Sequence, residues 1–287
     1  MTALELRFKE QAVLLGPRQS LVAIVARPLD STQSAEPAVV ILNTGIVHRV
    51  GHHRMYVTLS RILAGTGRTV VRFDFSGIGD SAPRSDGLTP LMSCLQDIKE
   101  ALDSLERLRL ASRFVLVGLC SGADHAVLYG HTDPRVAGLV LMDPTLPRTA
   151  RYYFHYILQR LGNLQNWMSV LTGRSGLLRL AAEHVVNWVR PQPQGNLQQL
   201  DLGNLPFSPY LITCYRATAT RRQRILFVLT SVSTRHTYAQ QWRDAFPEVG
   251  SSGAVRAEFF AKSDHLFSAG KDQELLFQVI TDWLASA

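Results

Sequence analysis

The sequence predicts an α/β fold in which a mostly parallel sheet is flanked by helices and interrupted by an inserted helical cap. Patterns typical of strands and of helices alternate in the first and last parts of the chain, as parallel strands with crossover helices require. A Gly-Leu-Cys-Ser-Gly pentapeptide at residues 118–122 joins one strand pattern to the following helix pattern. The alternation breaks at Pro144 and resumes after residue 223.

The expected elements follow in order along the chain. Apolar residues at 5–15 and 20–27, joined by Gly16-Pro17, predict two antiparallel strands. Short apolar runs predict the remaining strands at 39–43, 69–73, 114–119, 136–142, 225–229 and 255–260. Apolar residues at every third or fourth position predict helices at 54–64, 91–108, 123–131, 237–246 and 272–284.

Two kinds of sequence divide the chain into a core and a cap. Residues 1–143 and 224–287 carry the alternating pattern and are expected to form one α/β core. Residues 144–223 are helical in pattern, rich in aromatic residues and without a strand signal of the core type. We therefore expect residues 144–223 to form the inserted cap.

Composition limits the class of protein. A chain of 287 residues with 46% hydrophobic residues can bury one large core. There is no run of 18 apolar residues and no apolar segment of a signal peptide, so we expect no membrane span and a cytoplasmic location. The three cysteines, Cys94, Cys120 and Cys214, are too few and too scattered for a disulfide framework or a metal knuckle, which favours a free reactive thiol.

The pentapeptide points to Cys120 as a nucleophile. Glycines at 118 and 122 permit a strained turn from strand to helix, and the helix N-terminus stabilises a thiolate. The alternative is a buried and inert cysteine, because cysteine is often a core residue. Ser121 is one position outside the glycine frame, so we expect its backbone N–H to act as an oxyanion-hole donor rather than its hydroxyl to attack.

The order of motifs resembles the α/β-hydrolase superfamily over essentially the whole chain. Besides the pentapeptide, residues 72–81 (Arg-Phe-Asp-Phe-Ser-Gly-Ile-Gly-Asp-Ser) resemble the turn after the fourth strand of lipase and aminopeptidase-like members. Asp264-His265 resembles the loop that carries the catalytic histidine. A cysteine at the nucleophile position is similar to dienelactone hydrolases, polyhydroxyalkanoate synthases and carrier-protein acyl-shuttling transferases. The resemblance implies acyl transfer through a covalent intermediate, with His265 as base and the N–H of Ile46 as second oxyanion-hole donor.

The acid of the triad is harder to place. No carboxylate follows the strand at 225–229, where the acid is usually found. Asp143 is the best substitute, since the carboxyl ends of parallel strands converge on one edge, although it also suits a turn before Pro144. Asp264 and Asp244 are further alternatives, whereas Asp74 and Asp80 are expected to fix the turn after the fourth strand.

The other histidines have plainer interpretations. His48, His52 and His53 cluster after the first core strand, but no carboxylate or cysteine joins them at ligand spacing, which favours an exposed loop over a metal site. Asp124 and His125 either line the site or face solvent and cap the helix. We expect neither a metal nor a cofactor.

Charge suggests the partner. Residues 144–223 hold nine arginines, no lysine and only two acidic residues, an excess that equals the +7 net charge of the whole chain. The arginines expected beside an entrance, Arg148, Arg151, Arg221 and Arg222, favour a phosphate-bearing partner such as an acyl carrier protein or coenzyme A. A solvated basic face is the alternative, and nucleic acid is not expected because no nucleic-acid-binding module is recognisable.

Together these features favour a cysteine-dependent acyltransferase or thioesterase that acts on an acyl thioester of a carrier protein or coenzyme A. One alternative is a hydrolase of small esters or lactones. A second alternative is a non-catalytic ligand receptor on the same scaffold, whose mark would be a broken pentapeptide or a missing histidine.

Overall fold

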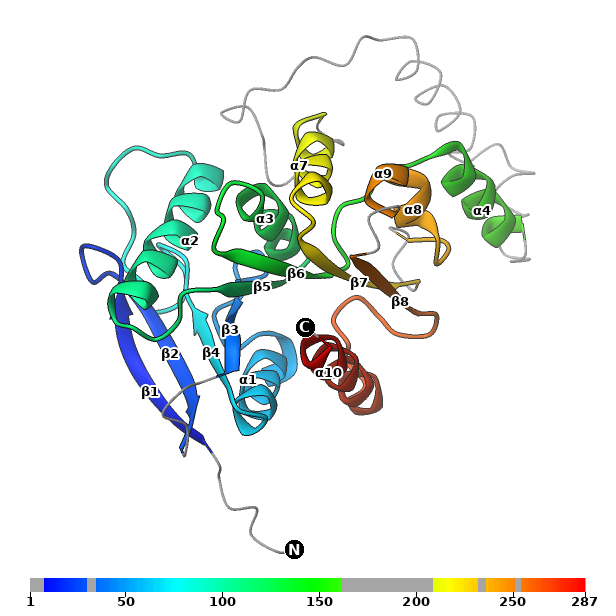
Figure 1. Ribbon diagram of the computed structural model, residues 1–287. Helices are drawn as coiled ribbons and strands as arrows, with labels where there is room; N and C mark the ends of the chain where they lie inside the picture. Colours follow the sequence, from blue (N-terminus) through cyan, green and yellow to red (C-terminus); the bar gives the residue numbers. More distant parts are fainter. Residues whose placement is uncertain (1–7, 30–34, 162–208, 232–235, 251–253, 287) are drawn as a thin grey trace, which may run out of the picture.

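An eight-stranded sheet runs through the centre of the protein (Figure 1). The structure is a computed structural model that describes residues 8–29, 35–161, 209–231, 236–250 and 254–286. The strand order is β1-β2-β4-β3-β5-β6-β7-β8. The strands are β1 (Phe8–Leu15), β2 (Leu21–Pro28), β3 (Ala35–Ile41), β4 (Arg68–Phe73), β5 (Phe114–Leu119), β6 (Val136–Met142), β7 (Arg224–Thr230) and β8 (Val255–Phe260).

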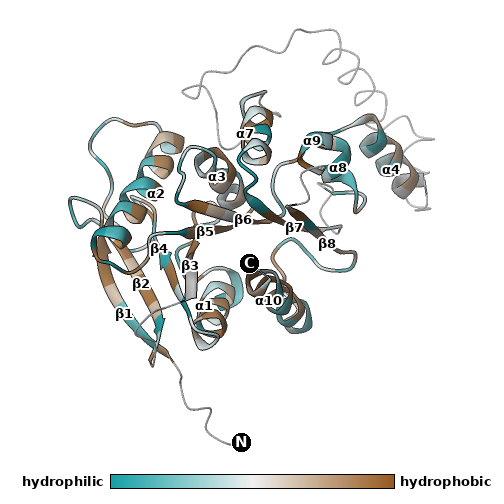
Figure 2. Cartoon of the chain, viewed as in Figure 1, coloured by the Kyte–Doolittle hydropathy of each residue, from teal (hydrophilic) through white to brown (hydrophobic). Residues whose placement is uncertain are grey.

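The sheet confirms the predicted fold class. β1 pairs antiparallel with β2, and β2 pairs antiparallel with β4. The six neighbouring strands β4, β3, β5, β6, β7 and β8 pair in parallel, so their carboxyl ends lie at one edge of the sheet. The central strands read as continuous apolar runs because both faces of the sheet are covered (Figure 2).

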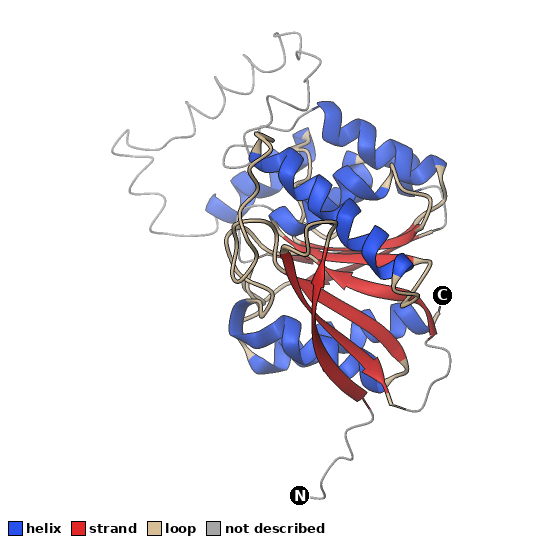
Figure 3. Ribbon diagram, turned by 90° about the vertical axis from the view of Figure 1, so that its left-hand side faces the viewer, coloured by secondary structure: helices blue, strands red, loops and turns tan. Residues whose placement is uncertain are grey.

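Helices cover the two faces of the sheet in separate layers (Figures 1 and 3). On one face α2 (Pro90–Arg107), α3 (Ser121–Gly130) and α7 (Pro209–Thr220) pack with Phe114, Leu139 and Phe227. On the other face α1 (Met55–Gly65) and α10 (Gly270–Ala285) pack with Val117, Val140 and Leu226. The remaining helices are η1 (His52–Arg54), α4 (Ala150–Leu161), α8 (Gln241–Ala245) and α9 (Pro247–Gly250).

The predicted helix at 237–246 is wrong in part. α8 spans only five residues and ends before Phe246, whose φ of −137° and ψ of 71° are not helical. Pro247 explains this break, because the proline ring disfavours a helical conformation in the residue before it. α9 then begins at Pro247, a position where the missing N–H does no harm.

The expected cap divides into parts with different outcomes. Residues 162–208 lie outside the described residues, so a cap there stays a prediction. Leu211, Cys214 and Tyr215 of α7 are buried in the same cluster as β5, β6 and β7, and α7 therefore belongs to the layer that covers the sheet. α4 follows β6 and lies on the side of α8 away from α3 (Figure 1).

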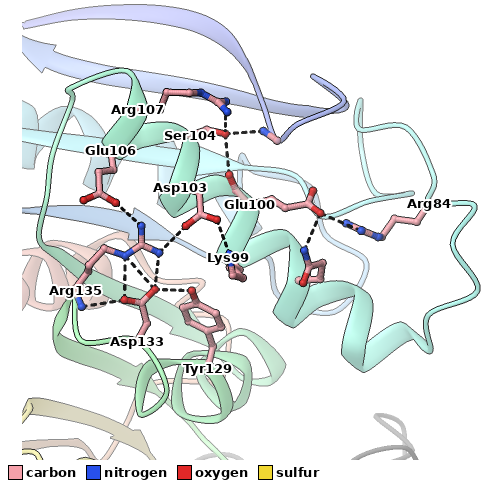
Figure 4. A network of polar contacts seen from close by, with 12 residues as sticks. Arg84, Lys99, Glu100, Asp103, Ser104, Glu106, Arg107, Tyr129, Asp133 and Arg135 are labelled. Atoms are coloured by element: carbon pink, nitrogen blue, oxygen red, sulfur yellow. Dashed lines mark hydrogen bonds and ion pairs between the residues drawn. The ribbon is translucent and has the colours of Figure 1, made fainter.

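A network of charged residues fixes the end of α3 that is remote from the pentapeptide (Figure 4). Arg135, just before β6, contacts carboxylate oxygens of Asp103, Glu106 and Asp133 at 2.7–2.8 Å. Tyr129 of α3 donates to Asp133 at 2.6 Å. Because Asp103 and Glu106 belong to α2, the network joins two helices to the amino end of β6.

No helix in the described part of the chain is long and apolar enough to cross a membrane.

Candidate active site

Cys120 occupies a strained turn between β5 and α3. Its φ of 56° and ψ of −120° lie in a region that residues with a Cβ rarely adopt. The Cys120 N–H donates to the carbonyl of Met142 at 2.9 Å, and its carbonyl accepts from the N–H of Ala123 at 3.0 Å. These bonds hold the turn in place, so that Cys120 stands at the N-terminus of α3.

The two glycines of the pentapeptide are required for steric reasons. A Cβ on Gly118 would overlap the backbone of Gly122. A Cβ on Gly122 would lie 2.5 Å from the carbonyl oxygen of Asn43. Gly118 therefore permits the tight turn from strand to helix that the pentapeptide predicts, and Gly122 allows the loop after β3 to approach that turn.

His265 and Asp143 meet at the carboxyl edge of the sheet. Nδ1 of His265 lies 2.8 Å from Oδ2 of Asp143, although 122 residues separate them in the chain. The Asp143 carboxylate is fully buried, and the His265 ring is partly exposed. The His265 ring also forms a hydrogen bond with Cys120. The structure thus brings together the three side chains that the sequence singled out.

The pKa values of the pair favour an ion pair. The hydrogen bond to Asp143, and then that to Cys120, raise the pKa of His265 to about 9 despite the opposing effect of burial. Burial acts to raise the pKa of Asp143, but contacts with His236, His265 and Thr230 outweigh it and lower the value to about 2. At neutral pH the arrangement therefore favours a carboxylate beside an imidazolium.

Two hydrogen bonds from Thr230 hold the Asp143 carboxylate at the end of β7, where the acid of the triad is usually found. Thr230 is the last residue of β7, and its N–H donates to Oδ1 of Asp143 at 2.6 Å. The Thr230 hydroxyl donates to Oδ2 at 2.5 Å. Asp143 itself has a φ of 45°, which turns the chain at the end of β6 toward β7. A carboxylate that follows β6 is thereby placed at the end of β7.

The loop that carries Ile46 is tied to the nucleophile turn through Ser121. The Gly45 N–H donates to Oγ of Ser121 at 2.7 Å, and the Val47 N–H closes a turn to the carbonyl of Thr44 at 2.9 Å. The loop that carries Ile46 is therefore joined to the nucleophile turn, and the role of the Ser121 and Ile46 N–H groups as oxyanion-hole donors stays a prediction. The sequence predicts a role only for the Ser121 backbone, whereas in the structure the Ser121 hydroxyl also accepts a hydrogen bond.

Asp74 anchors the same loop to the end of β4. Its fully buried carboxylate accepts from the Arg49 N–H at 2.5 Å, from the Arg49 guanidinium and from the Asp80 N–H at 3.2 Å. The Arg49 guanidinium also contacts Asp80 at 2.6 Å. Asn43 donates to Asp74 at 3.4 Å and accepts from the Phe75 N–H at 2.7 Å. The prediction that Asp74 and Asp80 fix this turn is confirmed.

The other two cysteines are poor nucleophiles. None of the three cysteines forms a disulfide. Burial raises the pKa of Cys94 to about 12, and Asp97 adds to the effect. Burial likewise raises the pKa of Cys214 to about 12. Both thiols stay protonated at neutral pH, which leaves Cys120 as the candidate.

The histidines near the site differ in their surroundings. His125 and Asp124 are buried, so the solvent-facing interpretation is wrong; Asp124 accepts from the N–H and the hydroxyl of Thr145. His52 lies close enough to His265 for their charges to interact, and its pKa is lowered by burial, by His53 and by His265. No group of three or more potential metal ligands is found among the described residues.

His236 is a residue near the site that no motif in the sequence indicates. It belongs to the loop after β7, and its ring, which is 1% exposed, contacts Asp143 on the side opposite His265. The one sequence feature that could have indicated His236 is its position in the loop after β7, where the acid of the triad is usually found.

The four arginines proposed for the entrance lie at two different edges. Arg148 and Arg151 follow β6 at the carboxyl edge, where Arg151 contacts Asp244 at 3.4 Å and lies over the ring of Tyr238. Arg221 and Arg222 follow α7 and precede the amino end of β7, and Arg221 acts on the pKa of His131 beyond the end of α3. The expected position beside the entrance is therefore wrong for Arg221 and Arg222, because α7 runs back to the amino edge of the sheet.

Several solved structures resemble the protein over nearly its whole chain. An esterase of Pyrococcus furiosus has a TM-score of 0.63 and 12% identity, with 100% of this chain and 93% of the esterase covered. A putative lipase of Acinetobacter baumannii has a TM-score of 0.60 and 13% identity, with coverage of 98% and 92%. A proline iminopeptidase of Mycobacterium smegmatis has a TM-score of 0.57 and 14% identity, with coverage of 97% and 98%.

At these identities the similarity shows the α/β-hydrolase fold. None of the curated proteins matches the sequence. The family described as Hydrolase_4, serine aminopeptidase S33, matches residues 36–194, which is more than half of the chain, and the protein therefore belongs to this hydrolase family with a cysteine at the centre of its pentapeptide.

Proposed function

We propose that the protein is a hydrolase that cleaves carboxylic esters through a covalent acyl-Cys120 intermediate. The observation that carries the proposal is the Cys120–His265–Asp143 arrangement, with the nucleophile on a strained turn and the base hydrogen-bonded to a buried carboxylate. A receptor without catalysis would have no need of this strain, which costs on the order of 1–3 kcal/mol.

The groups at the site can perform both halves of the reaction. The Cys120 thiolate attacks the carbonyl carbon, and the N–H groups of Ser121 and Ile46 stabilise the oxyanion. His265 donates its proton to the departing alkoxide, which leaves an acyl thioester on Cys120. Water then attacks this thioester, His265 accepts the proton, and the Cys120 thiolate leaves with the carboxylic acid as the product.

A second candidate is acyl transfer from a thioester of coenzyme A or a carrier protein. The thiol of Cys120 favours it, because exchange of an acyl group between two thiols is nearly isoenergetic. Of the four arginines considered, Arg148 and Arg151 lie at the carboxyl edge, where they would meet a phosphate-bearing partner, although Arg151 would then have to share or leave its contact with Asp244.

Mass spectrometry tests the common intermediate. Incubation with p-nitrophenyl acetate or acetyl-CoA, followed by an acid quench, is expected to add one acetyl group to Cys120, and the Cys120→Ala variant is expected to stay unmodified. Cys94→Ala is the matched control and retains the adduct, since the Cys94 thiol is protonated. Acetylation of another residue, or undiminished turnover by Cys120→Ala, would exclude the proposed mechanism.

Kinetics separate the two candidates. An ester hydrolase is expected to turn over p-nitrophenyl acetate at a rate that added thiol acceptors leave unchanged, whereas a transferase would partition its acyl group to them. For acetyl-CoA as donor, the double variant Arg148→Glu/Arg151→Glu is expected to raise KM, and Arg221→Glu/Arg222→Glu at the opposite edge is the control. Equal effects of both double variants would exclude recognition by Arg148 and Arg151.

A further inference from the structure

The buried carboxylate of Asp143 contacts two histidines. Its Oδ2 lies 2.8 Å from Nδ1 of His265, and its Oδ1 lies 3.2 Å from Nδ1 of His236. The His236 ring is almost fully buried, whereas the His265 ring is partly exposed and interacts with Cys120. One carboxylate is thus shared by a histidine that faces the nucleophile and by a second one behind it.

The partners of His236 restrict its hydrogens. Nε2 lies 3.0 Å from the carbonyl oxygen of Pro144. A carbonyl oxygen only accepts hydrogen bonds, so Nε2 carries a hydrogen. If Nδ1 carried none, its lone pair would face the carboxylate, and the two would repel each other. A hydrogen on Nδ1 makes the same contact favourable and gives the ring a positive charge.

The contact between His236 and Asp143 is an ion pair if the ring is protonated. The 3.2 Å separation is within ion-pair range, but Nδ1 does not meet the geometry of a hydrogen bond. Among the described residues, the charged group in contact with the ring is Asp143 at the end of β6, with His265 from the loop after β8 across the carboxylate. A charge on His236 therefore acts on His265 through Asp143.

We propose that His236 is a positioning residue that places a positive charge behind Asp143 and so limits how tightly the carboxylate holds the proton of His265. The inference rests on the proposed function, because it assigns His236 to the same Cys–His–Asp site. Its consequence is that His265 gives up its proton more readily than it would beside an unshared carboxylate.

Two substitutions separate the contacts of His236. In His236→Gln the side-chain amide can take the place of Nε2 and donate to Pro144, but no donor faces Asp143. In His236→Asn the shorter amide can take the place of Nδ1 and donate to Asp143, but the bond to Pro144 is lost. Neither variant carries the positive charge. His125→Phe is the control, since it removes another buried histidine that has no polar partner among the described residues.

The expected results with p-nitrophenyl acetate follow from these contacts. Both variants are expected to move the alkaline limb of kcat/KM upward by about 0.5–1 pH unit, as loss of a neighbouring positive charge requires. His236→Asn is expected to retain more of the wild-type kcat than His236→Gln, and His125→Phe to leave the alkaline limb in place. Better activity in His236→Gln with an unmoved limb would reduce His236 to an anchor for Pro144 and overturn the proposal.

Nuclear magnetic resonance tests the inference without turnover and without depending on variants. In the wild-type protein labelled with ¹⁵N-histidine, both ring nitrogens of His236 are expected to show the shifts of protonated nitrogens at pH 7. A neutral ring with a hydrogen on Nε2 alone would overturn the proposal. A charged His236 in a protein that forms no acyl-Cys120 would reject the proposed function and leave this charge arrangement standing, so the two failures are distinguishable.

Discussion

The backbone N–H of Thr230 donates to Oδ1 of Asp143 at 2.6 Å, and the Thr230 hydroxyl binds the other carboxylate oxygen. Through these two bonds the last residue of β7 holds a carboxylate that the end of β6 supplies. Position 230 therefore helps the protein to dispense with an acidic residue after β7.

Thr230→Val is expected to lower kcat by about tenfold, because the isosteric side chain removes the hydroxyl bond to Oδ2, a loss on the order of 1 kcal/mol in orientation of Asp143. The backbone bond remains, so the fold is expected to survive. The measurement is kcat for an acetyl ester together with the free energy of unfolding in urea.

Thr218→Val is the matched control for this variant. Thr218 is also fully buried, and its hydroxyl donates to the carbonyl of Tyr215 at 2.6 Å, far from Asp143 in the chain. Both variants are expected to lose a similar amount of stability, but only Thr230→Val to lose turnover. Similar kcat losses in both would show that reduced stability, rather than carboxylate orientation, causes the effect.

Asp143→Asn is expected to lower turnover and to move the alkaline limb of kcat/KM downward. The hydrogen bond to Asp143 is the main cause that raises the pKa of His265 to about 9, so an uncharged amide should return the pKa toward its usual value near 6.5. The loss of kcat should be smaller than the roughly 10⁴-fold loss in serine triads, since a thiolate is already a strong nucleophile.

The Asp143→Asn substitution is also expected to lower the stability of the fold, and to lower it more at acidic than at alkaline pH. A raised pKa of His265 stabilises the fold fully below pH 6.5 and loses this effect as the pH rises through 9. The wild-type protein should therefore exceed Asp143→Asn in Tm by more at pH 6 than at pH 9.5. Asp264→Asn serves as control, because Asp264 accepts from the Leu266 N–H at 2.7 Å within its own turn. An alkaline limb that stays near pH 9 in Asp143→Asn would exclude Asp143 as the partner of His265.

Ser121→Ala is expected to lower kcat by about tenfold without preventing acylation of Cys120. The hydroxyl of Ser121 is the acceptor for the Gly45 N–H, and its loss frees the loop that presents the Ile46 N–H. Complete removal of one oxyanion-hole donor costs about 10²–10³ in kcat, and a loosened donor should cost less. The measurement is kcat, with Ser268→Ala, an exposed serine in the His265 loop, as control.

If instead Ser121→Ala abolishes formation of the acyl-enzyme, the serine is the nucleophile and the assignment to Cys120 is wrong. If the variant has wild-type kcat, the bond between Gly45 and Ser121 has no part in catalysis. Retained acylation with reduced turnover is the pattern that the structure supports.

Features of the site that depend on local sequence could be predicted, and those that depend on packing could not. Cys120 sits in a turn whose glycines are adjacent in sequence, and His265 follows a strand directly, so patterns of a few residues indicate both. Asp143 follows from the rule that parallel strands end at one edge.

The remaining features require the three-dimensional arrangement. His236 has no sequence pattern that would indicate burial, and only the folded loop after β7 brings its ring to Asp143. Arg221 and Arg222 were expected at the entrance because a helical pattern does not reveal at which edge of the sheet a helix ends. The direction of α7 is set by its packing on α3 and by the start of β7.

His125 is expected to make the protein less stable in mild acid. Burial lowers its pKa to about 4, whereas in the unfolded chain it should titrate near its usual value of 6.5. Between these values the unfolded chain binds more protons, so the stability that a neutral His125 permits is fully present above pH 6.5 and is lost as the pH falls toward 4. His125→Phe removes this titration and keeps an aromatic ring against Phe75, whose centroid lies 5.5 Å from that of the imidazole. The free energy of unfolding in urea should fall between pH 7.5 and pH 5 by about 2 kcal/mol more in the wild-type protein than in the variant, since 1.36 kcal/mol corresponds to one pH unit. The contribution of His265 changes in the opposite direction, but it is common to both proteins and cancels in the comparison. An equal pH dependence of the two proteins would mean that His125 takes up its proton in the folded state as readily as in the unfolded chain, contrary to its burial.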